Sequence, residues 1–380
     1  MKNCEINNNQ TTGEFIVLGD ERYYAINNVN KMAPFFISVI SNSDHWLFVS
    51  STGGLTAGRV SPETALFPYI TVDRIHESDL HTGCKTLLRV NSDEGIVNWE
   101  PFNREHDNRF NITRNLYKSI LGNKLCFEEI NEDLNLKYKY TWSTSEEYGF
   151  VRQCELVNLS DKPVNVELID GFQNILPAGT PRFTQTNSSN LVDAYKWTEL
   201  DESSGLAFFT VYSGITDRAE PCESLKTNTV FCSGLEHSKI LLSSEQLPLF
   251  RTGCPVTQEA HKRGIRGAFL VNSTLTIEPN SSQYWQFVAN IEQSQSQAIA
   301  LRGQLSDAST LENNISTSIK QGSDHLARIM ATADAFQVTG EENVSVHHYA
   351  NVQFNVLRGG AFDNHYLVSS NDFSSTVNLF

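Results

Sequence analysis

The fold class is decided by residues 150–169, which read FVRQCELV, then NLSDKP, then VNVELI. Both flanks alternate apolar and polar residues with a period of two, which is typical of half-buried β-strands. The break between them combines Asn158, Ser160, Asp161 and Pro163, which are residue types that favour turns. We therefore expect two strands, 150–157 and 164–169, paired as a β-hairpin.

Similar runs occupy most of the chain from residue 12 to residue 292. The pattern of 35–40, a polar turn at 41–44 and 46–49 predicts strand, turn and strand. Further strands are expected at 136–142, 206–212, 268–271, 275–277 and 284–291. No repeat of fixed period is visible, which argues against a propeller or a solenoid. The predicted fold class is mainly β, a large antiparallel sandwich over residues 1–292.

The pattern changes to helical spacing near residue 293. Apolar residues recur every three or four positions in 297–304, 311–320, 323–335 and 347–360, the last ending in two glycines. We expect residues 293–380 to form a helical segment that is too small to bury itself. Its apolar residues, which include Val352, Val356, Leu357 and Phe362, either pack on the sandwich or have their partner outside this chain.

Composition excludes several classes of function. The 44 acidic and 29 basic residues give a net charge of −15, and no Lys/Arg run is present, so we expect no nucleic-acid partner. No apolar stretch approaches the roughly 18 residues of a membrane helix, and residues 1–10 do not resemble a secretory signal. Seven cysteines without a CxxC pair predict free thiols in a cytoplasmic protein.

The sequence offers few groups for catalysis. The acidic pairs Glu128-Glu129, Glu132-Asp133 and Glu146-Glu147 could act as acid and base on sugars, or could be solvated faces. His76 and His81 lack a third ligand, so we expect no metal site. Nucleophile motifs and nucleotide-binding glycine loops are also missing, and we expect no cofactor.

Two segments, 98–110 and 171–187, combine aromatic rings with amides and arginines. Such sets suit sugars, because hydroxyls bind polar groups while the C–H faces of the ring pack on aromatic side chains. Polar loops that cap a sandwich would have the same composition. The sugar-binding hypothesis names Trp99, Arg104, Arg109, Asn174, Arg182, Gln185 and Asn187.

The order of several motifs resembles one known family. Residues 34–42 (PFFISVISN) with 49–54 (VSSTGG) resemble the start of cellobiose-phosphorylase-like enzymes. Residues 152–168, with VNLSDKPV at their centre, look like a hairpin of the same enzymes, and 347–351 lie where the family joins its sandwich to a helical barrel. The resemblance implies a galactose-mutarotase-like super-β-sandwich followed by an (α/α)6 barrel that carries the general acid. That barrel would begin about where this sequence stops.

The resemblance implies a non-catalytic N-terminal sandwich domain of a glycoside phosphorylase or hydrolase, with no catalytic residue in this chain. The implied partners are carbohydrate, the missing C-terminal barrel of the same polypeptide and a second copy in a homodimer. Two alternatives stay open: a stand-alone carbohydrate-binding module, and a mutarotase-type sugar epimerase. The epimerase needs a His acid and a Glu base, and only Asn364-His365-Tyr366 resembles part of its motif.

Overall fold

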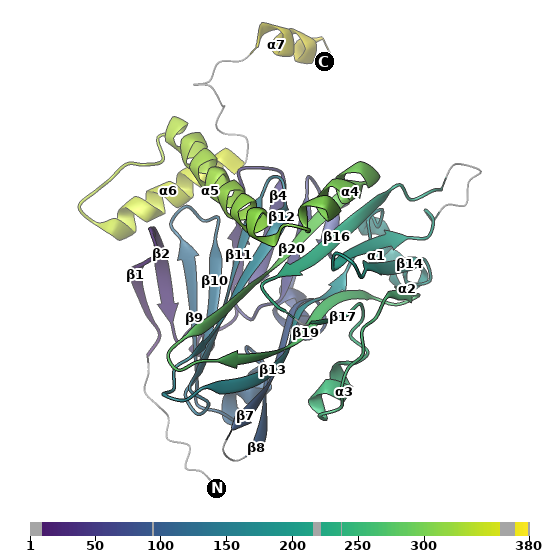
Figure 1. The fold of residues 1–380 in the computed structure, drawn as a ribbon. Helices are drawn as coiled ribbons and strands as arrows, with labels where there is room; N and C mark the ends of the chain where they lie inside the picture. Colours follow the sequence, from purple (N-terminus) through teal and green to yellow (C-terminus); the bar gives the residue numbers. More distant parts are fainter. Residues whose placement is uncertain (1–9, 93–94, 216–221, 237, 358–368, 379–380) are drawn as a thin grey trace. The chain divides into compact units, whose positions relative to one another are not determined.

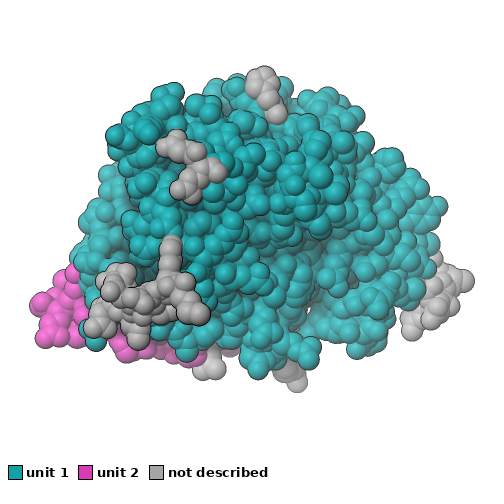
Figure 2. Space-filling model, turned by 90° about the horizontal axis from the view of Figure 1, so that it is seen from below, with its two compact units in different colours: residues 1–319 teal, residues 320–380 magenta. Residues whose placement is uncertain are grey.

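The computed structural model describes residues 10–92, 95–215, 222–236, 238–357 and 369–378. Strands hold 41% of the described residues and helices 26%, which confirms the mainly β fold class. Two compact units are present, residues 1–319 and residues 320–380, and Figure 2 colours them separately.

Three antiparallel sheets build the first unit (Figure 1). The largest has eleven strands, in the order β1 (Thr12–Leu18), β2 (Glu21–Asn27), β9 (Ile112–Ser119), β10 (Leu125–Asn131), β11 (Leu136–Ser145), β12 (Gly149–Asn158), β20 (Ser282–Ser294), β16 (Lys226–Ser233), β15 (Leu206–Val211), β14 (Lys196–Asp201) and β18 (His261–Arg263). The second has the order β17 (Lys239–Leu241), β19 (Gly267–Ile277), β13 (Val164–Ile175), β7 (Gly83–Ser92) and β8 (Gly95–Trp99). The third is β3 (Phe36–Val39), β4 (His45–Ser50), β5 (Leu55–Arg59) and β6 (Ala65–Phe67).

One apolar core joins the three sheets. Tyr138 of β11, Leu168 of β13 and Val49 of β4 are fully buried members of the same cluster. Their strands alternate inward apolar residues with outward residues, as the period-two pattern predicts for sheets that pack face to face. The predicted antiparallel sandwich is therefore confirmed.

The predicted hairpin at 150–169 is wrong, although both of its strands exist. β12 pairs with β11 and β20 in the eleven-stranded sheet, whereas β13 pairs with β7 and β19 in the second sheet. The break at 158–163 is therefore a crossing between layers. Leu156 on one sheet and Leu168 on the other both point into the core between the sheets, so the apolar faces of β12 and β13 are both buried. Alternation indicates which side chains point inward, but not which strand lies next in the sheet.

The other predicted strands are present. β3 and β4 form the predicted hairpin. The runs 268–271 and 275–277 belong to one strand, β19. Short helices and turns complete the first unit: η1 (Val29–Lys31), η2 (Asp73–Leu80), η3 (Arg104–Asn108), α1 (Arg182–Asn187), α2 (Ser189–Asp193) and α3 (Leu247–Arg251).

Helical residues 295–304 and 308–319 of the first unit cover part of the outer face of the eleven-stranded sheet. α4 (Gln295–Gln304) follows β20 directly, and α5 (Ala308–Thr332) is one continuous helix where the sequence predicted two. Leu311 and Ile315 of α5 are buried in a cluster with Val151, Phe231 and Val288 of the sheet. This part of the helical segment packs on the sandwich, which was one of the two expected outcomes. The first unit thus extends past the predicted boundary at 292, which remains a prediction.

The second unit contains the end of α5, α6 (Glu342–Leu357) and α7 (Ser370–Val377). Within it the rings of Phe336 and Tyr349 are in contact, with centroids 5.4 Å apart. Three predicted features lie outside the described residues: the two glycines expected to end the helix at 347–360, Phe362, and the Asn364-His365-Tyr366 fragment. No helix in the described part of the chain is long and apolar enough to cross a membrane.

Candidate functional site

The outer face of the eleven-stranded sheet changes character along its strands. Where α5 packs on it, outward residues such as Val151 and Val288 are apolar, and these two are register partners on β12 and β20. Two and four residues further along β12, the outward side chains are Gln153 and Glu155. The same strand therefore contributes to a helix-covered apolar band and to an open polar band.

One polar row crosses five neighbouring strands. The register aligns Asn115 with Glu128, Glu128 with Lys139, Lys139 with Glu155, and Glu155 with Tyr284. Directly opposed side chains on one face of an antiparallel pair are close enough to interact. β9, β10, β11, β12 and β20, which lie side by side in Figure 1, thus present an alternation of amide, acid, base, acid and phenol.

Hydrogen bonds hold this row in place. Lys139 Nζ lies 2.7 Å from Glu155 Oε2, and the Tyr284 hydroxyl donates to Glu155 Oε1 at 2.5 Å. Asn115 Nδ2 donates to Glu128 Oε1 at 2.9 Å, and Lys137 Nζ lies 3.7 Å from the other oxygen of Glu128. The charges alternate, so each acidic side chain of the row lies beside a base.

The electrostatics keep Glu155 ionised. Burial by itself would raise the pKa of its carboxyl, but the hydrogen bonds from Lys139 and Tyr284 outweigh burial, and the pKa lies below its ordinary value of 4.5. Burial would likewise lower the pKa of Lys139, whereas its bond to Glu155 raises it. At neutral pH the pair is a carboxylate, which accepts hydrogen bonds, and an ammonium, which donates them, and the carboxyl of Glu155 has no proton to give to a leaving group.

A groove of about 510 Å³ opens beside this pair, between β11, β12 and β20 and the start of α5. Besides Lys139, Glu155 and Tyr284, its lining includes Thr141, Gln153, Gln283, Gln286 and Glu312. Tyr284 is 60% exposed, so its ring offers a flat apolar surface next to charged and amide groups. This volume lies in the roughly 300–1,000 Å³ range of small-molecule sites.

Such a groove can bind a neutral ligand that carries many hydroxyls. Carboxylate, ammonium and amide groups each bond with hydroxyls, and an exposed aromatic ring can pack against apolar C–H groups. No group of three or more His, Cys, Asp or Glu side chains that could hold a metal ion occurs among the described residues.

The seven candidate sugar-binding residues lie elsewhere. None of them is among the described residues that line the groove. Trp99 is fully buried at the end of β8, and its indole donates to Glu129 Oε1 at 2.7 Å, so its ring presents no surface to a ligand in this structure. Arg109 is exposed and lies over the ring of its neighbour Phe110, and Asn187 is exposed at the end of α1.

The remaining four candidates surround the segment 69–82. Arg104 donates to the His76 carbonyl at 3.4 Å, and Asn174 donates to Thr82 Oγ1 at 2.9 Å. The Arg182 guanidinium lies over the Tyr69 ring, 5.3 Å from its centroid, and Gln185 Oε1 accepts from the Tyr69 backbone. The two predicted segments therefore approach the same stretch of chain, and their role in sugar binding stays a prediction.

The acidic pair Glu128-Glu129 is divided between the two faces of the sheet. Glu128 belongs to the outer row, whereas Glu129 is fully buried inside with Arg114 Nε 2.6 Å away. Successive residues of a strand point to opposite faces, so the two carboxyls cannot act on one substrate.

Sequence reasoning missed the groove residues Lys139, Glu155 and Tyr284. The alternation of apolar and polar residues shows that Lys139 faces away from the apolar side of its strand, and the same holds for Glu155 on the next strand. Tyr284 is 129 residues away from Glu155 in sequence, and only the pairing of β12 with β20 brings them together. No local signal reports that pairing.

No family model matches this chain, and neither does any curated protein. Solved structures with a similar fold include a bacterial glucoamylase complexed with acarbose, with 10% identity and a TM-score of 0.47 over 79% of this chain and 37% of that one. A protein named as a kojibiose phosphorylase from the human microbiome has 9% identity and a TM-score of 0.38 over 87% of this chain and 35% of that one. A protein named as an aldose 1-epimerase from Escherichia coli K12 has 9% identity and a TM-score of 0.35 over 68% of this chain and 99% of that one.

By name these three neighbours are a glucoamylase, a phosphorylase and an aldose epimerase. The chain spans little more than a third of the length of the glucoamylase and of the phosphorylase. With TM-scores below 0.5 and identities near 10%, the likenesses are partial and say nothing about activity.

Proposed function

We propose that this chain is a non-catalytic sandwich domain of a carbohydrate-active enzyme, a glycoside phosphorylase or hydrolase, and that it binds carbohydrate. The observation that carries the proposal is the groove in which the exposed Tyr284 ring lies beside the Lys139–Glu155 pair. Sugar hydroxyls would bond to Glu155, Lys139 and the glutamines of the lining, while one ring face would pack on Tyr284.

A binding role suits this groove better than catalysis. Glycoside hydrolysis uses two carboxyls, one of which is kept protonated by a raised pKa. Glu155 cannot be that protonated carboxyl, because Lys139 and Tyr284 hold its pKa below the ordinary value. The general acid would come from a helical barrel that follows in the same polypeptide, as the sequence resemblance implies, with a homodimer as a further expectation.

A cytoplasmic location completes the proposal. The described cysteines are free thiols. Burial raises the pKa of Cys84 to about 11 and that of Cys126 to about 12, so both are neutral and unreactive at pH 7. They serve as small apolar side chains, which fits a reducing compartment.

Calorimetric titration of the full chain with maltotetraose and cellotetraose tests carbohydrate binding. We expect saturable binding of at least one of these sugars, weakened about tenfold or more by Tyr284→Ala, since an aromatic anchor at the centre of a site contributes on the order of 1.4 kcal/mol or more. Tyr212→Ala is the matched control, because Tyr212 is also exposed but does not line the groove. Equal affinity of the Tyr284 variant and the wild type would contradict the groove assignment.

The mass of the polypeptide in its native source tests the enzyme context. A mass well above 42.7 kDa would support a domain of a larger enzyme. A mass of 42.7 kDa together with sugar binding would favour the stand-alone carbohydrate-binding module instead.

A further inference from the structure

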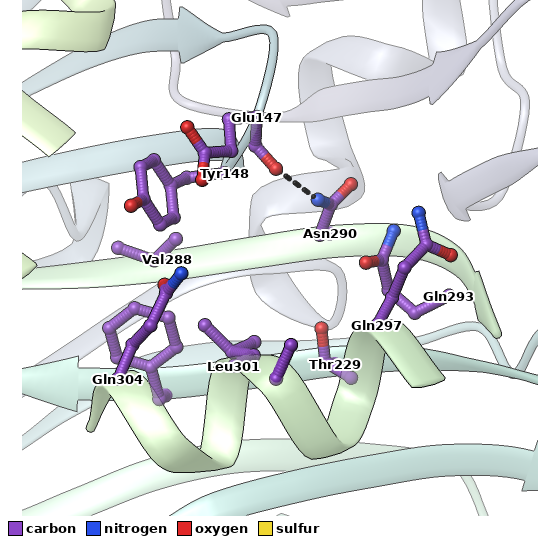
Figure 3. A pocket seen from close by; sticks show the side chains of 11 residues that line it. Glu147, Tyr148, Thr229, Val288, Asn290, Gln293, Gln297, Leu301 and Gln304 are labelled. Carbon is purple, nitrogen blue, oxygen red and sulfur yellow. Dashed lines mark hydrogen bonds between the residues drawn. The ribbon is translucent and has the colours of Figure 1, made fainter. Parts of the chain in front are cut away.

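A second, smaller cavity lies between α4 and the outer face of β16 and β20. Its volume is about 160 Å³, and it shares no described lining residue with the groove. Figure 3 shows Gln293 and Gln297 next to each other at one end, Gln304 at the other end, and Glu147 and Tyr148 across from the helix. The apolar part of its wall is formed by Phe231, Val288 and Leu301.

Thr229 contributes a hydroxyl that lacks a partner. The residue is 1% exposed, it lines the cavity, and its Oγ1 makes no hydrogen bond in the structure. A buried polar group without a partner is costly, and native proteins satisfy nearly all such groups with protein, water or ligand. We therefore expect a molecule in the cavity to form a hydrogen bond with this hydroxyl.

The two glutamines offer complementary groups. Gln297 Oε1 accepts from the Ser294 backbone N–H at 2.9 Å in the capping box of α4, which positions the side chain and leaves its amide NH2 to donate. Gln293 uses its NH2 to donate to the Ile291 carbonyl at 3.0 Å, which leaves its amide oxygen to accept. The cavity thus presents a donor at Gln297, an acceptor at Gln293 and a hydroxyl at Thr229.

A backbone irregularity coincides with this cavity. The pairing of β16 with β20 shifts register between Thr227 and Thr229, directly beside the register pair Thr229 and Asn290. Two residues after Asn290, Glu292 has a φ of 56°, a left-handed conformation that is uncommon outside glycine. Bulges are over-represented at sheet edges and next to active sites, where they redirect side chains.

From these observations we infer that the cavity beneath α4 is a binding site for one small, neutral, hydroxyl-rich molecule, of the size of a single monosaccharide ring. Hydroxyls both donate and accept, so they match the three groups of Gln293, Gln297 and Thr229. The described lining has no Lys or Arg to neutralise an anion. The volume corresponds to about five waters at roughly 30 Å³ each, which is too small for an oligosaccharide.

Binding of D-glucose, D-galactose and glycerol to the full chain, followed by ligand-observed NMR, tests the inference. We expect saturable binding of at least one of them, weakened tenfold or more by Thr229→Val, which removes the hydroxyl and nearly preserves the volume. Thr56→Val is the matched control, because Thr56 is also fully buried with an unpartnered hydroxyl but does not line the cavity. Gluconate, which carries a charge, should bind at least tenfold more weakly than glucose.

Gln293→Leu provides a second test if Thr229→Val fails to fold, and it should weaken binding by a similar factor. Tyr212→Ala, which lines neither the cavity nor the groove, should leave binding of the small ligand unchanged. The groove is tested with oligosaccharides and the Tyr284 variant, and the cavity with monosaccharides and the Thr229 and Gln293 variants, so the failure of either site is distinguishable from that of the other. The inference is overturned if none of the three molecules binds saturably, which would mean a cavity for water only. It is also overturned if a folded Thr229 or Gln293 variant binds as tightly as the wild type.

Discussion

Arg152 is a charged residue in the centre of the sandwich, and its removal should be among the most damaging single changes in the chain. The side chain is fully buried, with Nη1 3.0 Å from Asp170 Oδ1 and Nη2 2.5 Å from the Tyr138 hydroxyl. Its guanidinium also lies 4.7 Å from the centroid of the Tyr140 ring. Asp170 is fully buried as well and accepts from Trp285 Nε1 at 2.7 Å.

The size of the effect follows from the charge that would be left behind. Arg152→Met roughly preserves the apolar stem but leaves the Asp170 carboxylate without its ion-pair partner, and breaking a buried pair in this way costs about 3–5 kcal/mol. Neutral donors such as Trp285 remain around Asp170, so we expect Arg152→Met to lower the free energy of unfolding by about 3–4 kcal/mol. The double variant Arg152→Met/Asp170→Leu should recover part of this loss, because it removes both buried charges.

Urea unfolding at pH 7, followed by tryptophan fluorescence, measures these differences. Arg302→Met is the control, because Arg302 pairs with Asp201 at the surface and is 56% exposed, so its loss should cost less than about 1 kcal/mol. The reasoning is refuted if Arg152→Met costs no more than Arg302→Met. It is also refuted if the double variant is less stable than Arg152→Met alone.

Two further changes in stability follow from the core. Burial, assisted by the charge of Arg59, lowers the pKa of His45 from 6.5 to about 4. As the pH falls, His45 is therefore protonated in the unfolded chain before it is protonated in the folded one. The free energy of unfolding is highest above pH 6.5 and decreases by roughly 3 kcal/mol between pH 6.5 and 4. Urea unfolding at pH 7 and 4.5 should show a smaller loss for His45→Gln than for the wild type, and equal losses would contradict this assignment. Asn158→Ala should cost about 2 kcal/mol, because the buried amide donates to the Lys162 carbonyl at 2.7 Å and to the Ile277 carbonyl at 3.0 Å. The exposed Asn165→Ala should change thermal stability by less than about 0.5 kcal/mol, and a similar loss in both variants would argue against the role of Asn158.

The strands were largely predictable because their alternation is a local property. The runs at 136–142 and 150–157 show which side chains share a face, and the structure confirms that Leu156 points inward and Glu155 outward. The helices were also predictable, although the apolar spacing did not show that 311–335 contains one long helix. The hairpin at 150–169 failed because its turn-forming residues serve equally well in a crossing between sheets.

The candidate site was less predictable, because composition favoured the wrong segments. Aromatic and polar residues cluster in 98–110, yet Trp99 is a core residue whose indole satisfies the buried Glu129. The sequence around Tyr284 predicts a strand and nothing more. Tyr284 becomes part of a candidate binding groove only because Glu155 lies opposite it on a neighbouring strand.

The sequence by itself determined the mainly β class, the inward and outward faces of its strands and the helical character of its C-terminal part, because each depends on residues a few positions apart. The tertiary structure alone decided that β12 leaves its sequence neighbour β13 and pairs with β20 instead. Strand order depends on how distant apolar faces cover one another, and that global packing leaves no local trace. The row from Asn115 to Tyr284 and the cavity beneath α4 are consequences of that order.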